Sequence, residues 1–210
     1  ADLEPLSQTA RDNNLHLNVL ILGTMPQLPA SVYGTGIYGS YALPSSWQVN
    51  VDEENRILDL LRTEISTYLS EQGTSAEVRF AAGEIPFLTE AVTHLAQTCD
   101  KVIIGDDLRG NEPLFSTILR AALFHAPAGV LLNAAKSTKA LQPKSAFVAW
   151  KAGMPSSRAV RSAIPILKSA GDVVVALFDP QTTDSTNGEN PGSDVAAWLS
   201  HQGCHVTLQQ

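Results

Sequence analysis

The sequence has little of what marks several classes of protein. Only two of its 210 residues are cysteines, and Cys99 and Cys204 lie far apart along the chain. This spacing argues against a disulfide framework and fits a reducing compartment. No apolar run reaches the 18 residues typical of a membrane-spanning helix, and residues 1–14 have acidic side chains but no apolar centre. We therefore expect a cytoplasmic protein with no membrane partner.

Positive charge is also scarce in this chain. It holds 14 basic and 21 acidic side chains, which gives a formal net charge of −7. Residues 1–143 account for nine of the basic and sixteen of the acidic side chains, whereas residues 144–210 hold five of each. Because a negative surface is repelled by nucleic-acid phosphates and by anionic lipids, we expect no nucleic-acid partner.

Catalytic and metal-binding constellations are missing from the sequence as well. Ser116 and Thr117 have no neighbouring histidine in a nucleophile elbow, and Asp106 and Asp107 are adjacent, so their carboxylates diverge. The histidines and cysteine of HQGCH, residues 201–205, flank a glycine and have no second cluster to supply a fourth ligand. A soft-metal site there is the weaker interpretation, and we predict neither catalytic nor metal-binding residues.

What the sequence does contain is a series of apolar segments, with 44% of its residues apolar. Unalternated apolar runs at 102–104 and 130–132 predict strands covered on both faces. Between them Leu114 and Ile118 recur at helical spacing, so a strand, a crossover helix and a parallel strand follow one another. Ligands bind outside the carboxyl ends of parallel strands, and residues 105–111 therefore mark the predicted edge of a site.

The same reasoning predicts further helices and strands on both sides of this segment, with Asn50, Ser156 or Ser157, and Ser193 as helix caps. The predicted helices cover residues 3–13, 50–72, 83–98, 160–170 and 193–202. The predicted strands cover residues 15–22, 76–81, 145–150, 172–178 and 204–208.

Two long segments, 23–50 and 179–192, are predicted loops because they are rich in glycine, proline and polar residues. The first loop carries aromatic side chains that suit stacking on a base. The plainer interpretation is that they pack on their own domain or on a second copy. The aromatic residues of this first loop are Tyr33, Tyr38, Tyr41 and Trp47.

Two stretches of the sequence resemble the tandem-domain branch of the universal stress protein (UspA-like) family. They are VIIGDDLRGNEPLFSTILRAALFHAPAGVLL and KSAFVAWKAGMPSSRAVRSAIPILKSAGDVVVALFDP, and the part AFVAWKAG…SSRAVRSAIPIL is the most specific. The resemblance covers most of the chain. It implies a Rossmann-like α/β fold, with a parallel five-stranded sheet and helices on both faces, in two tandem domains. The first domain then covers residues 1–135, the linker 136–144, and the N-terminal part of the second domain 145–210.

The order of elements also indicates a weak internal repeat, because the loops after Leu22 and after Phe178 fall at equivalent places. In the family's fold the opening strand is central to the sheet, and the first domain lacks it here. Its absence leaves unpaired backbone on two neighbouring strands. We expect this strand in a longer chain. The alternative is that residues 145–150 pair with the first sheet.

Nucleotide-binding members of the family carry a glycine pattern after the fourth strand: glycine, two residues, glycine, nine residues, then glycine and a hydroxyl residue. Its small residues let backbone N–H groups cradle phosphates. Here four residues separate Gly105 from Gly110, and residues 120–122 lack the closing glycine and the hydroxyl. Residues 106–107 are both aspartates, which Arg109 only partly offsets. The resemblance thus implies a degenerate nucleotide site at Gly105, Arg109 and Gly110.

In ATP-binding relatives an aspartate follows the first strand of the domain and binds adenine. The corresponding residues of the second domain, 149–153, contain no aspartate. Lys151 could instead meet a phosphate and Trp150 could stack on a base, with Gly153 beside them. A solvated lysine and a packed tryptophan are the plainer interpretation. ATP or AMP is the ligand that this second site would take, and its glycine motif would lie beyond Gln210.

Three hypotheses for function follow from the resemblance. The leading one is a stress-response protein that acts as a non-catalytic interaction or sensor module. The second is an ATP- or AMP-binding protein, with slow hydrolysis, that uses the second domain. An enzyme of the broader nucleotide α-hydrolase-like group is more distant, because it needs a phosphate loop that the sequence lacks. Since family domains pair through edge strands, we expect Val130, Leu131 and Leu132 to form a seam between domains or subunits.

Overall fold

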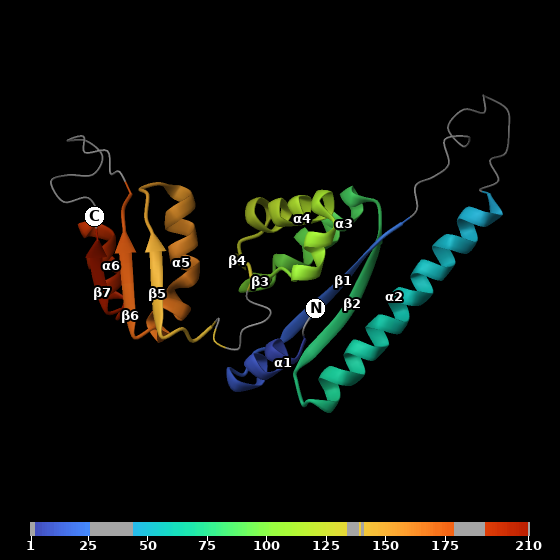
Figure 1. The fold of residues 1–210 in the computed structure, drawn as a ribbon, viewed down its shortest axis with the longest axis horizontal. Coiled ribbons are helices and arrows are strands. Elements are labelled where there is room, and N and C mark those ends of the chain that lie inside the picture. Colours follow the sequence, from blue (N-terminus) through green and yellow to red (C-terminus); the bar gives the residue numbers. More distant parts are fainter. Residues whose placement is uncertain (1–2, 26–43, 134–138, 140, 179–191, 210) are drawn as a thin grey trace, which may run out of the picture. The chain divides into compact units, whose positions relative to one another are not determined.

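A computed structural model describes residues 3–25, 44–133, 139, 141–178 and 192–209. The backbone divides into two compact units (Figure 1). Unit 1 comprises Ala1–Cys99 and Gly105–Pro127, and unit 2 comprises Asp100–Ile104 and Ala128–Gln210.

The described residues of unit 1 form five helices and two strands. In chain order they are α1 (Leu3–Asp12), β1 (Leu17–Thr24), α2 (Ser45–Glu71), β2 (Ala76–Gly83), α3 (Ile85–Ala96), the short 3-10 helix η2 (Asp106–Gly110) and α4 (Glu112–His125). The described part of unit 2 contains β3 (Lys101–Ile103), β4 (Gly129–Leu131), β5 (Ser145–Ala149), α5 (Met154–Ser169), β6 (Asp172–Ala176), α6 (Ser193–His201) and β7 (Val206–Gln209).

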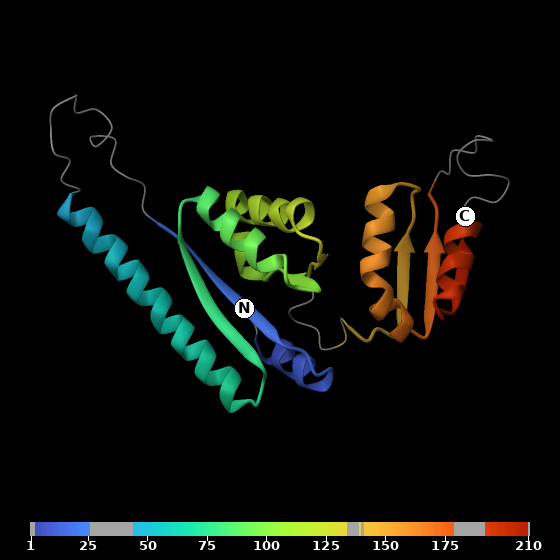
Figure 2. The same cartoon turned by 180° about the vertical axis from the view of Figure 1, so that it is seen from behind.

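In unit 1 a parallel strand pair lies between helices. β1 pairs with β2 along its whole length, from Leu17 opposite Ala76 to Thr24 opposite Gly83. α2 lies along one face of this pair, and α3 and α4 cover the other (Figures 1 and 2). Gly23 permits the close approach of α2, because a Cβ at this position would lie 2.5 Å from Cδ1 of Leu58.

Apolar burial on the second face holds α3 and α4 against the strands. Leu20 and Leu22 of β1 pack against the buried residues of this cluster, which come from β2, α3 and α4. These buried residues are Ala81, Leu88, Val92, Leu114, Ile118 and Ala121. Removing such side chains from water is the main favourable term in folding.

Unit 2 is built around the parallel sheet β5-β6-β7. α5 and α6 pack on the same face of it, and Arg161 of α5 lies over the ring of Trp198 of α6, 5.1 Å from its centroid. The buried residues of this layer are Val148, Val160, Leu167, Ala170, Val173, Val175, Leu177, Val195, Leu199 and Cys204. On the opposite face Phe147 is 60% exposed, so in the described residues this sheet is covered on one side.

The second strand pair of unit 2 contacts α5. β3 and β4 are parallel, with Val102 opposite Val130, and β4 packs against α5. The Nζ of Lys101 donates a hydrogen bond to Oγ of Ser162 at 3.2 Å. Gly129 lies so close to Ser162 that a Cβ there would overlap the hydroxyl. The glycine is therefore required by the close packing of β4 on α5.

The helix-to-strand turns after α2 and after α6 have similar sequences and the same backbone hydrogen bonds. Residues 68–76, YLSEQGTSA, join α2 to β2, and residues 198–206, WLSHQGCHV, join α6 to β7. Gly73 (φ +65°) and Gly203 (φ +90°) occupy the same position in the two turns. The backbone hydrogen bonds also correspond: Gln72 to Tyr68 and Gln202 to Trp198, Gly73 to Ser70 and Gly203 to Ser200, Thr74 to Leu69 and Cys204 to Leu199. The turn after α1 repeats these bonds with Asn14, at φ +51°, in the place of the glycine.

The strand pairing differs from the simplest expectation. The described strands form parallel sheets of two, two and three strands, not one five-stranded sheet. The alternative in which residues 145–150 pair with the first sheet is wrong, because β5 pairs with β6 of unit 2. The α/β class and the parallel strand direction are confirmed.

Three predicted helix caps are wrong. α2 begins at Ser45, so Asn50 lies inside the helix, and no glycine or proline stands between Pro44 and Asn50 to stop the helix earlier. α5 begins at Met154, ahead of both predicted serines, because a proline in its first turn favours an earlier start. Ser193 is the first residue of α6, and the capping position belongs to Gly192, with φ +83°.

Most of the two predicted loops, residues 26–43 and 179–191, lies outside the described residues, as do Tyr33, Tyr38 and Tyr41. Trp47 lies in α2 instead. Of the predicted linker, residues 136–138 and 140 are likewise outside the description. Among the helices that the structure describes, none combines the length and the apolar character needed to cross a membrane.

Candidate functional site

The predicted site edge after β3 is folded into a compact turn. Residues 106–110 form η2, and its first carbonyl belongs to Gly105, whose φ of −66° and ψ of 144° are open to any residue. The N–H of Leu108 donates to the Gly105 carbonyl at 3.3 Å, and the N–H of Asn111 donates to the Leu108 carbonyl at 3.0 Å. These backbone donors are therefore already used within the turn.

The start of α4 is closed in the same way. Oδ1 of Asn111 accepts from the N–H of Leu114 at 3.3 Å, and the carbonyl of Asn111 accepts from the N–H of Phe115 at 2.8 Å. Pro113, between them, has no N–H. A helix start binds anions through its first free N–H groups, and here an asparagine side chain and a proline reduce their number.

The charges of this turn also oppose a phosphate. Asp106 and Asp107 form the first turn of η2. The guanidinium of Arg109 lies 3.8 Å from Oδ1 of Asp106 and over the ring of Phe115, 4.9 Å from its centroid. The predicted cation is thus held between a carboxylate and an aromatic ring. Gly110 borders open space, with no atom within 4 Å of a built Cβ.

A hollow of about 370 Å³ lies elsewhere in unit 1, at the carboxyl end of β1. Its lining consists of Thr24, Met25, Asn50, Glu53 and Glu54. This hollow was not predicted, because residues 50–72 were interpreted only as a helix that Asn50 caps. The signal that could have revealed it is the position of Thr24 at the carboxyl end of a parallel strand.

The hollow is acidic. Arg56 donates two hydrogen bonds to the carboxylate of Glu53, at 2.7 and 2.8 Å, and this contact holds the pKa of Glu53 below its ordinary value. The contact with Arg56 thus favours the ionised form of Glu53. Among the described residues, the lining contains carboxylates, an amide and a hydroxyl, and neither lysine nor arginine. Such a surface suits a cationic or neutral polar group and not a phosphate.

In unit 2 the predicted residues lie at the carboxyl end of β5. The N–H of Trp150 donates to the carbonyl of Ala176 at 2.8 Å, and its partly buried side chain packs against the core of the unit. Lys151 is exposed. Gly153 has φ +154° and ψ 161°, a conformation that residues with a Cβ rarely adopt, and it directly precedes α5.

The start of α5 is more open than that of α4. No side chain caps it. The N–H of Ser157 donates a backbone hydrogen bond to the carbonyl of Gly153, at 3.0 Å. Its first turn carries two serines and no acidic residue. Chemically, this end offers backbone N–H groups, hydroxyls and the ammonium of Lys151 to an anion.

The six predicted site residues fall into separate sets. Gly105, Arg109 and Gly110 belong to unit 1, whereas Trp150, Lys151 and Gly153 belong to unit 2. Along the chain the first set follows β3 and the second follows β5.

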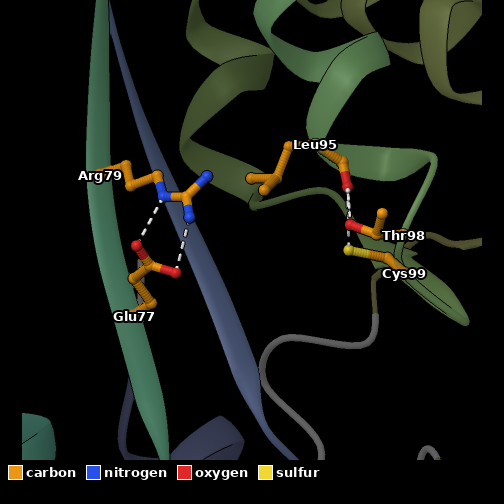
Figure 3. Close-up of polar contacts among 5 residues, drawn as sticks. All are labelled: Glu77, Arg79, Leu95, Thr98 and Cys99. Atoms are coloured by element: carbon orange, nitrogen blue, oxygen red, sulfur yellow. Dashed lines mark hydrogen bonds and ion pairs between the residues drawn. The ribbon is translucent and has the colours of Figure 1, made fainter.

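The cysteines lie away from both sets. Cys204 is 6% exposed, and burial raises the pKa of its thiol, while the nearby Lys168 ammonium opposes this rise. Cys99 follows α3 and is partly exposed. Its Sγ donates to the carbonyl of Leu95 at 3.3 Å, beside the hydroxyl of Thr98 (Figure 3).

On β2, the same view shows a second polar contact. The guanidinium of Arg79 donates two hydrogen bonds to the carboxylate of Glu77, at 2.7 and 2.8 Å (Figure 3). Both side chains are about half exposed. Exposed ion pairs of this kind contribute little to stability, typically about 0.2–1 kcal/mol, and we assign this one no role in a site.

Among solved structures, this chain is similar to a universal stress protein from Archaeoglobus fulgidus DSM 4304. The two are 14% identical with a TM-score of 0.61, over 99% of this chain and 71% of that one. No family model and no curated protein matches the sequence. The likeness shows the fold, an arrangement of helices and parallel strands like that of a universal stress protein, and so confirms the resemblance at that level.

Proposed function

We propose that the chain belongs to the universal stress protein family and acts in the stress response as a non-catalytic interaction or sensor module in the cytoplasm. The observation that carries this proposal is the closed turn between β3 and α4. A module of this kind works through the surfaces that it presents to other proteins or domains, so it requires no phosphate site in this turn.

Three features of that turn support a degenerate nucleotide site. The backbone donors of Leu108, Asn111, Leu114 and Phe115 bond within the chain. Two aspartates form the first turn of η2. The one arginine of the turn is held by Asp106 and Phe115. A phosphate would have to break these contacts and approach the carboxylates, and each step costs free energy.

The proposal includes two tandem domains, over residues 1–135 and 145–210. The shared sequence pattern Leu-Ser-x-Gln-Gly at residues 69–73 and 199–203 supports it, because two copies of one domain should share such a segment. The hydrogen bonds of the turn alone are less specific, since they also occur after α1. The family's five-stranded sheet would place its opening strand between the pairs β1-β2 and β3-β4. Val130 and Leu131 of β4, with Leu132, are the proposed seam, and the packing of β4 on α5 is consistent with it.

A second candidate function is the binding of ATP or AMP by the second domain, with slow hydrolysis. It is favoured by the uncapped start of α5, with Lys151 exposed beside it and Gly153 in a conformation suited to glycine. Trp150 is then a packing residue at the edge of the site.

A thermal-shift titration with ATP and AMP separates the two candidates. We expect no stabilisation at millimolar nucleotide, since a ligand that binds the folded state must raise the melting temperature. The variant Lys151→Ala and its matched control Lys144→Ala remove one exposed lysine at opposite ends of β5. A shift that disappears in Lys151→Ala and persists in Lys144→Ala would replace the leading proposal with the second one.

A further inference from the structure

α2 carries an exposed stripe of apolar and acidic side chains. Only Leu58 and Leu69 of this 27-residue helix are buried. On another side of the helix Ile57 is 40% exposed, Leu60 55% and Leu61 39%. The members of the stripe, spaced three or four residues apart on one side of the helix, are Glu54, Ile57, Leu61, Glu64, Tyr68 and Glu71. All of them are exposed except Tyr68, which is partly buried. We call this set the acidic stripe.

The charges of the acidic stripe are not neutralised on α2. Its two arginines pair with other carboxylates, Arg56 with Glu53 and Arg62 with Asp59. Among the described residues, Glu54 and Glu64 make no ion pair. An apolar patch between free carboxylates, on a helix that buries so little, fits contact with a cationic partner better than contact with water alone.

α5 presents the opposite charge. Its exposed side consists of Met154, Arg158, Arg161, Pro165 and Lys168, again three or four residues apart. We call this set the basic stripe. α5 has no acidic residue, and none of its three cations makes an ion pair within the described residues. Met154 is 72% exposed, so this stripe too mixes apolar surface with charge.

Among the described residues, other charged groups near α5 come from β3, where Nζ of Lys101 donates to Oγ of Ser162, and from α6. Arg161 lies over the ring of Trp198, which holds its guanidinium on this side of the helix layer. The α6 carboxylate of Asp194 accepts from the N–H of Val195 at 2.8 Å, so it serves the start of its own helix. Lys168 lies near Gly203 in the turn after α6.

The two stripes match in length and in the spacing of their charges. Glu54 and Glu64 are ten residues apart on α2, and Arg158 and Lys168 are ten residues apart on α5. At a rise of about 1.5 Å per residue, both pairs are separated by about 15 Å along the helix. Antiparallel helices would therefore bring Glu54 to Lys168 and Glu64 to Arg158, with apolar residues of both stripes between them.

We propose that the acidic stripe of one copy of this chain docks on the basic stripe of a second copy. A two-fold axis would form the contact twice, with each copy giving α2 to its partner's α5. The basic stripe does not include Ser162, the α5 residue against which Gly129 of β4 packs, and the proposal does not rest on the proposed function. Its occupant is a second copy because one chain carries both complementary stripes.

Sedimentation velocity on the full chain, over a range of protein concentrations, tests the proposal. We expect a dimer at low salt. Its dissociation constant should rise at least about tenfold at about 1 M salt, because the Debye screening length there is only about 3 Å. Two double variants reverse the charges: Arg158→Glu with Lys168→Glu, and Glu54→Lys with Glu64→Lys. Each should dimerise at least about tenfold more weakly than the parent chain, because attraction becomes repulsion.

Mixing the two double variants is the decisive step. In both contacts the carboxylates of one variant then face the cations of the other: Glu54 and Glu64 face Lys168 and Arg158 in one contact, and the introduced glutamates face the introduced lysines in the other. An equimolar mixture should therefore recover the dimer. Lys144→Glu is the control: it reverses an exposed charge of unit 2 outside α5 and should leave dimerisation unchanged. A chain that stays monomeric at every concentration, a dimer that both double variants retain, or a mixture that stays monomeric would overturn the proposal.

Discussion

Gly73 and Gly203 close equivalent turns, one in each unit. Each donates its N–H to the carbonyl of a serine three residues earlier, Ser70 or Ser200, at 2.9 Å in both cases. Each has positive φ, +65° and +90° respectively, at the end of a helix. A residue with a Cβ is strained in this region, so both turns depend on glycine.

Replacing either glycine should destabilise its unit. Gly73→Ala and Gly203→Ala force an alanine into positive φ, and we expect each to lower the free energy of unfolding by about 1 kcal/mol. Gly110→Ala is the control, since Gly110 is not among the residues with positive φ and borders open space. Urea denaturation measures all three. Equal stability of the Gly203→Ala and Gly110→Ala variants would contradict the role of positive φ.

The packing of β4 on α5 leads to a second prediction. Gly129→Ala places a Cβ against the hydroxyl of Ser162, and we expect a loss of about 1–3 kcal/mol. Ser162→Gly removes the side chain that the Cβ would meet, although glycine inside a helix itself costs about 1 kcal/mol. In a double-mutant cycle followed by denaturation, the two changes should therefore cost less together than their sum. If the two losses of unfolding free energy simply added, residues 129 and 162 would not be in contact.

A buried hydroxyl pair joins α1 to the turn before β2. Oγ of Ser7 and Oγ1 of Thr74 lie 2.7 Å apart, and Arg11 donates to Ser7 at 2.8 Å. Thr74→Val keeps the shape but removes one partner, so we expect a loss of about 1–2 kcal/mol in unfolding free energy. Thr63→Val, on the exposed side of α2, is the matched control and should cost less. A Thr74→Val variant as stable as the control would count against this hydroxyl pair.

The two thiols should differ in reactivity. Cys204 is buried with a raised pKa, whereas Cys99 is partly exposed. Because the thiolate is the reactive form, we expect iodoacetamide to modify Cys99 at least about tenfold faster in the native protein. Mass spectrometry of peptides after timed quenching measures both rates. Equal rates under native conditions, and not only in urea, would show that Cys204 is accessible.

The raised pKa of Cys204 also fixes the sign of a pH effect. The folded state keeps the thiol protonated at pH values where the unfolded chain ionises, so unfolding releases a proton. The stability from this residue is complete below the unfolded pKa and declines as pH rises above it. Cys204→Ala should remove part of the loss of stability at alkaline pH, as measured by denaturation. An unchanged pH profile in this variant would contradict the assignment.

Much of the α/β pattern could be predicted from the sequence. Every predicted strand and helix has a counterpart, because apolar periodicity reflects which side of an element is buried. Helix starts were predicted less well. Asparagine is a favourable capping residue, but Asn50 lies inside α2, which begins at Ser45. The start of a helix depends on the backbone conformation of the preceding residues, which a single residue type does not reveal.

The sites show why local sequence falls short. The missing glycine pattern after Gly105 predicted a degenerate site, but not that Asn111 would cap α4 or that Phe115 would lie under Arg109. Those contacts depend on how η2 folds. The hollow beside Thr24 brings together residues more than twenty positions apart, and no periodicity reports such a contact.

Calorimetric titration with ATP and AMP, in the presence of Mg²⁺, tests the central claim most directly. The claim is that this chain is an interaction module whose turn between β3 and α4 holds no phosphate. We predict no heat of binding at millimolar nucleotide, in the parent chain or in Arg109→Ala. Saturable binding that weakens in Arg109→Ala while Lys151→Ala binds normally would contradict the claim, because it would place the phosphates at Gly105 and Gly110.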